Sequence, residues 1–491
     1  MKKALALLVM CFMALGASLA YADSRTDGMN VDSRFVDDLD LIWLYPNMAN
    51  DYKNTVDFRT GYLSHGDEWG GILDGEHADL GTLGAYVYRP NGYDGTRNWN
   101  FNTGTGWWGV GSGWRSSGWG IFGEWGNSSY WYDDVATPEN KVDLFWANKW
   151  DTTSFGIQLN YADALPGDYQ DKYNDTGYPY SENWQQGSRV IGVNLGLGLT
   201  DGTFFNQANF HAGFALGSAN MAYSWTWSGT TYENDSIKDN GIYTLSFGTL
   251  LQHDLDQNSN MRFFADVYLD QNNQTMVLNY DNGGTTGLHN EAGDVDETWT
   301  GKYNDVITTL GFGCNHKVLD GKALISSGLQ ATWVSANNKQ SGTTQDDASA
   351  TSSPYDVTYD EEAYDIWTLN WNVSVEAHVA SWLDIRAGMN RPIINRDGWW
   401  YRDDYNYVGN SPTASYKETE TSDDYSGGDG STYSMGFGIH WENWELNAVV
   451  DVQDTFDSIA NVAPGNGIFF YGSQNGGALV TNWDADIRYR F

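Results

Sequence analysis

The chain has 491 residues, of which 41% are hydrophobic, 15% aromatic and only 18% charged, and its formal net charge is −38. This charge disfavours nucleic acid as a partner, because phosphate backbones are bound by clustered Lys and Arg. Two cysteines cannot form a disulfide scaffold. The many Trp, Tyr and Gly residues exclude a disordered acidic chain and suit a large sheet with one apolar and one polar face.

The N-terminus predicts a secretory signal peptide over residues 1–22. A short basic start precedes an apolar or small run over residues 4–19, and Ala20 and Ala22 supply small residues at a cleavage site. A membrane-spanning helix is the weaker interpretation, because the run is short and its flanks favour export. Cleavage after Ala22 would leave Cys314 as the single cysteine. We therefore expect an exported protein.

Apolar and polar residues alternate strictly along several segments, which predicts strands with one apolar face. From Trp367 to Val379 every odd position is apolar and every even position is polar. The same pattern recurs over residues 155–161, 191–197, 383–390 and 444–452.

Short turn-like segments alternate with long polar segments along the chain. The long ones lie near residues 163–186, 228–237, 281–299, 337–362, 393–430 and 454–477. This layout is typical of an outer-membrane barrel, whereas a β-sandwich has no reason to segregate its loops. The pattern predicts an all-β protein, a transmembrane antiparallel up-and-down β-barrel with short periplasmic turns and long extracellular loops.

Counting strands back from the C-terminus favours 14 strands, with residues 80–88 as the first. An even number is expected because both ends of such a barrel lie in the periplasm. A barrel of 16 strands is possible, and it would add residues 56–62 and a strand within residues 117–126.

The last nine residues alternate up to a terminal aromatic residue. This segment resembles the C-terminal strand of Gram-negative outer-membrane β-barrel proteins, which the barrel assembly machinery recognises. The resemblance implies an outer-membrane location, with membrane lipid and that machinery as partners. It assigns the assembly signal to Trp483, Ile487, Tyr489 and Phe491.

Residues 23–79 are expected to form a periplasmic N-terminal segment and possible plug, and residues 80–491 the barrel. An Asp-rich stretch ending in Pro46-Asn47 is distantly similar to the plug of fatty-acid-transporter-like barrels, where the order is Asn-Pro. Residues 91–140 hold many Trp and Gly, which predicts a loop folded into the barrel mouth or an aromatic binding surface.

The polar face of the strands should point into the lumen. Unpaired charges cannot be buried dry, so either water fills the lumen or these groups pair across it. The candidate pore-lining residues are Asp143, Arg262, Asp266, Lys322, Glu376, Asp384, Arg386, Glu445, Asp451, Asp484, Asp486, Arg488 and Arg490.

The long polar segments carry far more acidic than basic residues, which favours cations at the barrel mouth. No cofactor or metal site is expected, although Ca²⁺ or Mg²⁺ could bind to loop carboxylates. The main hypothesis is a porin-like channel for passive diffusion of small hydrophilic solutes, leaning towards cations. The alternatives are a fatty-acid-transporter-like barrel for hydrophobic compounds and a surface binding or adhesion barrel. No enzyme is expected, because no catalytic motif has the required spacing.

Overall fold

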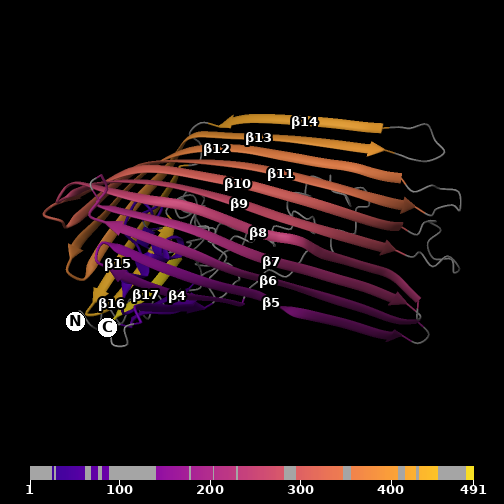
Figure 1. Ribbon diagram of the computed structural model, residues 1–491, viewed down its shortest axis with the longest axis horizontal. Helices are drawn as coiled ribbons and strands as arrows, with labels where there is room; N and C mark the ends of the chain where they lie inside the picture. Colours follow the sequence, from indigo (N-terminus) through magenta and orange to yellow (C-terminus); the bar gives the residue numbers. More distant parts are fainter. Residues whose placement is uncertain are drawn as a thin grey trace, which may run out of the picture.

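The chain folds into one antiparallel sheet that closes on itself as a barrel (Figure 1). The computed structural model describes residues 25–26, 29–60, 68–75, 80–87, 140–175, 178–202, 204–227, 230–280, 295–346, 355–406, 415–426, 431–451 and 483–491. The predicted signal peptide and most of the Trp-rich segment 91–140 lie outside these ranges. No helix in the described part of the chain is long and apolar enough to cross a membrane.

In the part of the chain that the structure describes, short helices precede the strands. The elements are α3 (Leu41–Leu44), η1 (Pro46–Tyr52), β1 (Thr55–Thr60), β2 (Glu68–Asp74), β3 (Thr82–Val87), β4 (Asn140–Trp150), β5 (Thr153–Asp175), β6 (Tyr178–Thr200), β7 (Gln207–Trp227), β8 (Thr230–Asp256), β9 (Ser259–Tyr280), β10 (Val295–Val318), β11 (Ala323–Asp346), β12 (Tyr355–Ala380), β13 (Leu383–Asn406), β14 (Ser415–Ser426), β15 (Thr432–Trp441), β16 (Trp444–Asp451) and β17 (Trp483–Arg490).

The barrel has 16 strands, so the favoured number of 14 is wrong. β14 and β15 pair with different parts of β13 and form two pieces of one barrel strand. β1 pairs with both β2 and β17, and this closes the ring. Of the two strands expected in a 16-stranded barrel, the one near residues 56–62 is β1. The other added strand is β2, and not a strand within residues 117–126, which lie outside the described ranges. Two adjacent glycines interrupt the alternation of apolar and polar residues in β2, so its sequence does not predict a strand.

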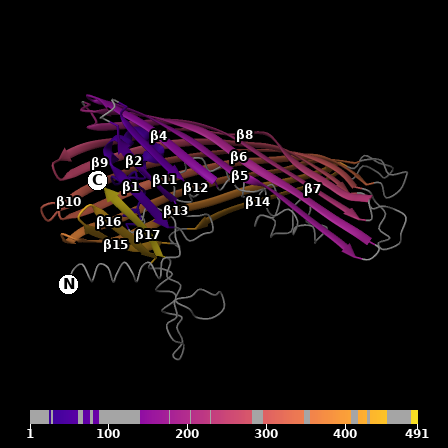
Figure 2. The same cartoon turned by 90° about the horizontal axis from the view of Figure 1, so that it is seen from below.

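The strands on one side of the barrel are much longer than the sequence pattern indicates (Figure 2). The lengths of β5 to β13 range from 21 residues in β7 to 27 residues in β8. Much of the segments 163–186, 337–362 and 393–430, which we expected to be loops, continues these strands. Beyond the lipid both faces of a strand meet water, so apolar and polar residues no longer need to alternate, and the pattern disappears while the strand continues.

The predicted alternation is confirmed in the part of the barrel that lies nearer the short turns between strands. Leu144 and Leu159 are half exposed on the outer surface, at 49% and 52%, while Asp143 and Asn160 beside them are buried on the inner side. A closed barrel pairs all of its backbone groups, and an apolar outer face suits contact with acyl chains.

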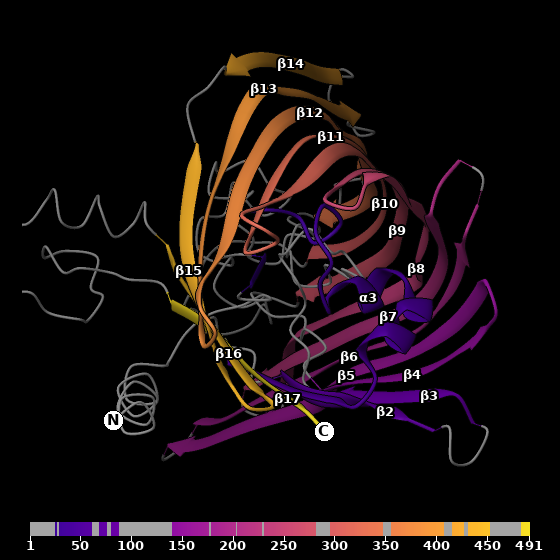
Figure 3. The same ribbon diagram turned by 90° about the vertical axis from the view of Figure 1, so that its left-hand side faces the viewer.

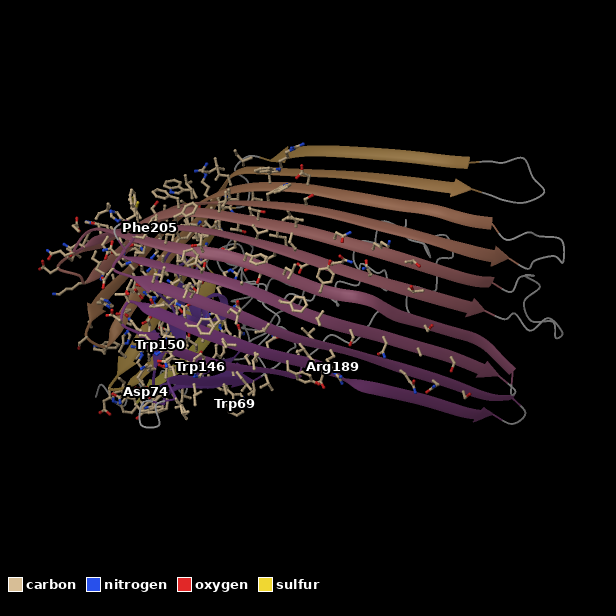
Figure 4. All side chains as sticks on the ribbon, in the orientation of Figure 1. Trp69, Asp74, Trp146, Trp150, Arg189 and Phe205 are labelled. Atoms are coloured by element: carbon tan, nitrogen blue, oxygen red, sulfur yellow. The ribbon has the colours of Figure 1, made fainter. Side chains whose placement is uncertain are left out.

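Aromatic side chains gather near the end where the strands are joined by short turns, here called the short-turn end. Figure 4 shows Trp146 and Trp150 on β4, the strand that leads into one of these turns. Trp382, Trp441 and Trp444 also flank turns there and are exposed by 39%, 40% and 47%. Such a belt suits the headgroup level of a membrane.

Candidate functional site

The N-terminal residues 25–26 and 29–52 lie inside the ring of strands, and they are called the plug here. Figure 3 shows α3 within the ring of strands. Met29, Phe35, Trp43 and Tyr45 are each no more than 1% exposed. Pro46 ends α3, because the residue before a proline avoids helical geometry, and it starts the tighter helix η1.

Aromatic contacts hold the plug against two separate parts of the wall. The Trp43 ring lies 4.9 Å from that of Tyr86 on β3 and 5.0 Å from that of Phe145 on β4, both edge-on. The Phe35 ring lies 5.0 Å from that of Phe264 on β9. Edge-on aromatic pairs add about 0.5–1.5 kcal/mol beyond the area that they bury.

Glycines on β5 and β6 let the start of η1 approach the wall. A Cβ atom built on Gly156 would overlap the backbone of Pro46 and Asn47, and one on Gly196 would lie 2.8 Å from the Asn47 nitrogen. The Asn47 side-chain amide donates to Asn209 Oδ1 at 2.8 Å. Any side chain at these glycines would therefore displace η1.

A buried ion pair joins the plug to β9. The guanidinium of Arg34 pairs with Asp266, and both side chains are at most 2% exposed. His211 Nε2 on β7 lies 3.0 Å from the other oxygen of Asp266. Arg34 also pairs with Asp32 and lies 4.1 Å above the Phe264 ring. Removing one partner of a buried pair is strongly destabilising, because it leaves an uncompensated charge.

A second polar network joins the plug to β12, β13 and β16. Arg25 donates to both oxygens of Glu376, at 2.9 and 2.7 Å. Glu376 also accepts from Arg386 at 2.7 Å, and Arg386 donates to Asn447 Oδ1 at 2.6 Å. The network continues from Asn447 to Asp486 on β17 at 3.0 Å. The plug is therefore attached to the strands that close the barrel.

Burial and neighbouring charges shift the pKa values of titratable groups in the plug. Burial lowers the pKa of Arg34, but the carboxylates of Asp32 and Asp266 outweigh it and hold that pKa well above its usual value. The Arg262 guanidinium on β9 lowers the pKa of Asp37, and burial raises the pKa of Tyr45. The charged forms of Arg34 and Asp37 are thus favoured at neutral pH.

Most candidate pore-lining residues lie on the inner side of the barrel, in contact with one another or with the plug. Lys322 and Arg490 are instead exposed near the short-turn end. The side chains of Asp451 and Asp484 lie outside the described part of the structure. The inner residues, buried or half-buried, are Asp143, Arg262, Asp266, Glu376, Asp384, Arg386, Glu445, Asp486 and Arg488. That they line an aqueous path remains a prediction.

Sequence reasoning missed the plug side chains that bind the wall, namely Arg25, Arg34 and Asn47. It also missed their partners His211 and Asn209. The plug has no repeating pattern that would single out these residues, and their partners lie more than 100 residues away in the chain. The alternation around Asn209 and His211 indicates only that both face the lumen.

The expected assembly signal lies on the strand that closes the ring. β17 pairs with β1 and β16. Ile487 and Phe491 are exposed by 38% and 56%, and the Tyr489 ring lies 4.6 Å from that of Trp444. The Trp483 side chain is outside the described part. Recognition by the assembly machinery remains a prediction.

A closed antiparallel sheet with an apolar outer surface is the arrangement that lets strands cross a bilayer. The chain has the fold of outer-membrane β-barrels. No family model matches the chain, and no curated protein matches it.

Several solved outer-membrane barrels are similar to it in fold. One is the ferric yersiniabactin uptake receptor FyuA from Yersinia pestis, with 9% identity over 89% of this chain and 70% of that chain and a TM-score of 0.32. Another is a FadL homologue from Pseudomonas aeruginosa, with 12% identity over 71% and 78% and a TM-score of 0.27. The outer membrane protease OmpT from Escherichia coli has 12% identity over 70% and 97% and a TM-score of 0.22. These likenesses concern the fold alone.

Proposed function

We propose that the protein is an outer-membrane uptake barrel whose lumen passes small hydrophilic solutes when the plug moves. The observation that carries this proposal is the reach of the plug across the lumen. Trp43 contacts β3 and β4, Asn47 contacts β7, Arg34 contacts β9 and Arg25 contacts β12. A segment attached on so many sides obstructs free diffusion, so passage requires its displacement.

The polar inner wall supports hydrophilic solutes as the cargo. The buried residues that face inward include several carboxylates, guanidiniums and carboxamides, for example Asp143, Asn160 and Arg386. The acidic segments favour cations over anions once a path is open. Passive diffusion with a preference for cations is thus expected of the unplugged barrel, with the short-turn end facing the periplasm.

Removing the plug tests this proposal. We expect the purified full chain to give small or rare current steps in a planar bilayer, and a variant that lacks residues 23–52 to give large steady ones. Cation preference would show as a reversal potential in a salt gradient. Large steady steps from the full chain would contradict the proposed obstruction, and the absence of steps from both proteins would contradict a channel.

Cross-linking the plug to the wall should block its movement. Asn30 in the plug donates to Thr432 Oγ1 on β15 at 2.9 Å. In a Cys314→Ser background, we expect a short cross-linker with two thiol-reactive methanethiosulfonate groups to join Asn30→Cys to Thr432→Cys through reducible disulfides. This cross-link should abolish uptake by proteoliposomes. Reduction should restore uptake. Each single-cysteine variant serves as a control, and unchanged uptake by the fully cross-linked protein would show that this part of the plug does not move.

The plug also favours a second candidate, a fatty-acid-transporter-like barrel for hydrophobic compounds. Its core is apolar, with Met29, Phe35, Leu44 and Met48 in one buried cluster with wall residues such as Phe264. This candidate predicts saturable binding of a radiolabelled long-chain fatty acid to the full chain, which the hydrophilic-uptake proposal does not. The surface-binding alternative depends on residues 91–140, nearly all outside the described part.

A further inference from the structure

A group of inward polar side chains lies on β4, β5 and β6 beside the plug. Its members are Asp143, Gln158, Asn160 and Asn194, and each is at most 3% exposed. Asp143 and Asn160 are direct register partners, as are Gln158 and Asn194. Directly paired side chains on one face have Cβ atoms about 4.5–5.5 Å apart. Gln158 and Asn160 on β5 therefore lie between Asp143 on β4 and Asn194 on β6.

The plug fixes the orientation of this group from one side. Asn194 donates through Nδ2 to the carbonyl oxygens of Trp43 and Leu44, at 3.1 and 3.0 Å, so its Oδ1 atom points away from them. Phe145, which contacts Trp43, lies two residues nearer the short turn than Asp143. The group thus borders the plug on the side opposite to the short-turn end.

Oxygen atoms of this group lack hydrogen-bond partners. Among the described residues, Asp143 accepts one side-chain hydrogen bond, from Gln158 Nε2 to Oδ1 at 2.9 Å. Asp143 Oδ2, Gln158 Oε1, Asn160 Oδ1 and Asn194 Oδ1 are all buried and without a partner in the described structure. No described Lys, Arg or His forms an ion pair with Asp143, unlike Asp266 or Glu376.

A carboxylate buried without a countercharge is costly, by several kcal/mol per ion in real proteins. The unpartnered oxygens of this group are carboxylate and carboxamide oxygens, which are ligands for hard cations such as Ca²⁺. We propose that Asp143, Gln158, Asn160 and Asn194 bind a hard cation, Ca²⁺ or Na⁺, at the boundary between the plug and the wall. This inference goes beyond the proposed uptake function and does not depend on it.

Cation binding to the full chain in detergent tests the proposal. After removal of divalent ions with a chelator and exchange into a choline buffer, we expect CaCl2 or NaCl to raise the melting temperature with saturation. Which salt acts at the lower concentration identifies the ion. Equilibrium dialysis with ⁴⁵Ca²⁺ or ²²Na⁺ counts the ions bound. If neither ion binds with saturation, the proposal is overturned.

Two variants locate the site and one matched variant controls for it. Asp143→Asn removes the charge and should abolish one saturable site and the salt-dependent rise in melting temperature. Asp151→Asn makes the same change at an exposed position in the turn of the same hairpin and should change neither. Any weak binding of Ca²⁺ to the acidic surface segments would be the same in the unaltered chain and in both variants, so the difference between the three proteins is the measurement.

If Asp143→Asn does not fold, Asn160→Leu still tests the site. Asn160 makes no side-chain hydrogen bond in the described structure, so its loss leaves no partner unpaired. We expect its melting temperature in chelator to equal or exceed that of the unaltered chain, and its cation affinity to fall at least tenfold. Undiminished affinity in Asn160→Leu, or equal binding in Asp143→Asn and the unaltered chain, would overturn the proposal.

Discussion

Replacing Arg34 with Met is expected to release the plug and turn a closed barrel into a leaky one. Arg34→Met keeps much of the apolar stem but leaves Asp266 buried beside His211 without its guanidinium partner. Breaking a buried pair from one side costs about 3–5 kcal/mol. At about 1.36 kcal/mol per tenfold change, the ratio of undocked to docked plug should rise roughly 10²- to 5 × 10³-fold. Current recordings in planar bilayers, scored by the fraction of time spent conducting, measure this change.

Two further variants separate plug release from general damage. In the double variant Arg34→Met with Asp266→Asn neither charge remains, so most of the docked population should return. Arg490→Met removes an arginine that is exposed near the short-turn end and should leave the currents unchanged. If Arg34→Met conducts no more than Arg490→Met, the buried pair does not hold the plug.

A single methyl group at Gly156 should displace η1. Gly156→Ala places a Cβ atom against the backbone of Pro46 and Asn47, which cannot move aside as a flexible side chain would. Overpacking costs typically about 1–3 kcal/mol, and backbone contact places this variant at the upper end. We expect more frequent opening in bilayers, and faster proteolysis of the plug than in the unaltered chain.

Gly84→Ala is the matched control for that variant. Gly84 is also an inward glycine, on β3, but the three atoms nearest to an added Cβ belong to the wall residues Phe145, Gly71 and Ile72, at 3.2–3.4 Å. Because alanine suits a strand better than glycine, the barrel itself should melt at an equal or higher temperature in both variants. Equal opening in Gly84→Ala and Gly156→Ala would show that η1 does not depend on the glycine.

The sequence predicts the barrel well because lipid imposes a simple rule on its strands. One face must be apolar, so Trp367 to Val379 can be assigned residue by residue, and the structure confirms that assignment at Trp367, Trp371 and Val375, which are exposed by 46%, 40% and 38%. The rule fails where lipid ends. The outer parts of β5 to β13 and the glycine-interrupted β2 carry no such pattern. For this reason the favoured strand number is wrong, and much of the expected loops 163–186, 337–362 and 393–430 is strand.

The plug is harder to predict, because its position depends on contacts between distant parts of the chain. Asp37 to Asp40 mark an unusual segment, yet nothing local shows that Arg34 meets Asp266 or that Asn47 meets Asn209. The inner wall shows a similar limit. Alternation places Asp143 inside, but only the register shows that its neighbours are Gln158 and Asn160.

The long strands on one side of the barrel create two sheet edges above the membrane. In the described structure, β5 beyond Asp163 pairs with β6 alone, and β14 pairs with β13 alone. Exposed edges invite pairing with strands of other molecules, and charged residues discourage it. Within β5 the edge carries Asp168, Asp171, Lys172 and Asp175, and β14 carries Lys417, Glu418, Glu420, Asp423 and Asp424. The charged residues of these two segments therefore disfavour edge-to-edge pairing between copies of the chain.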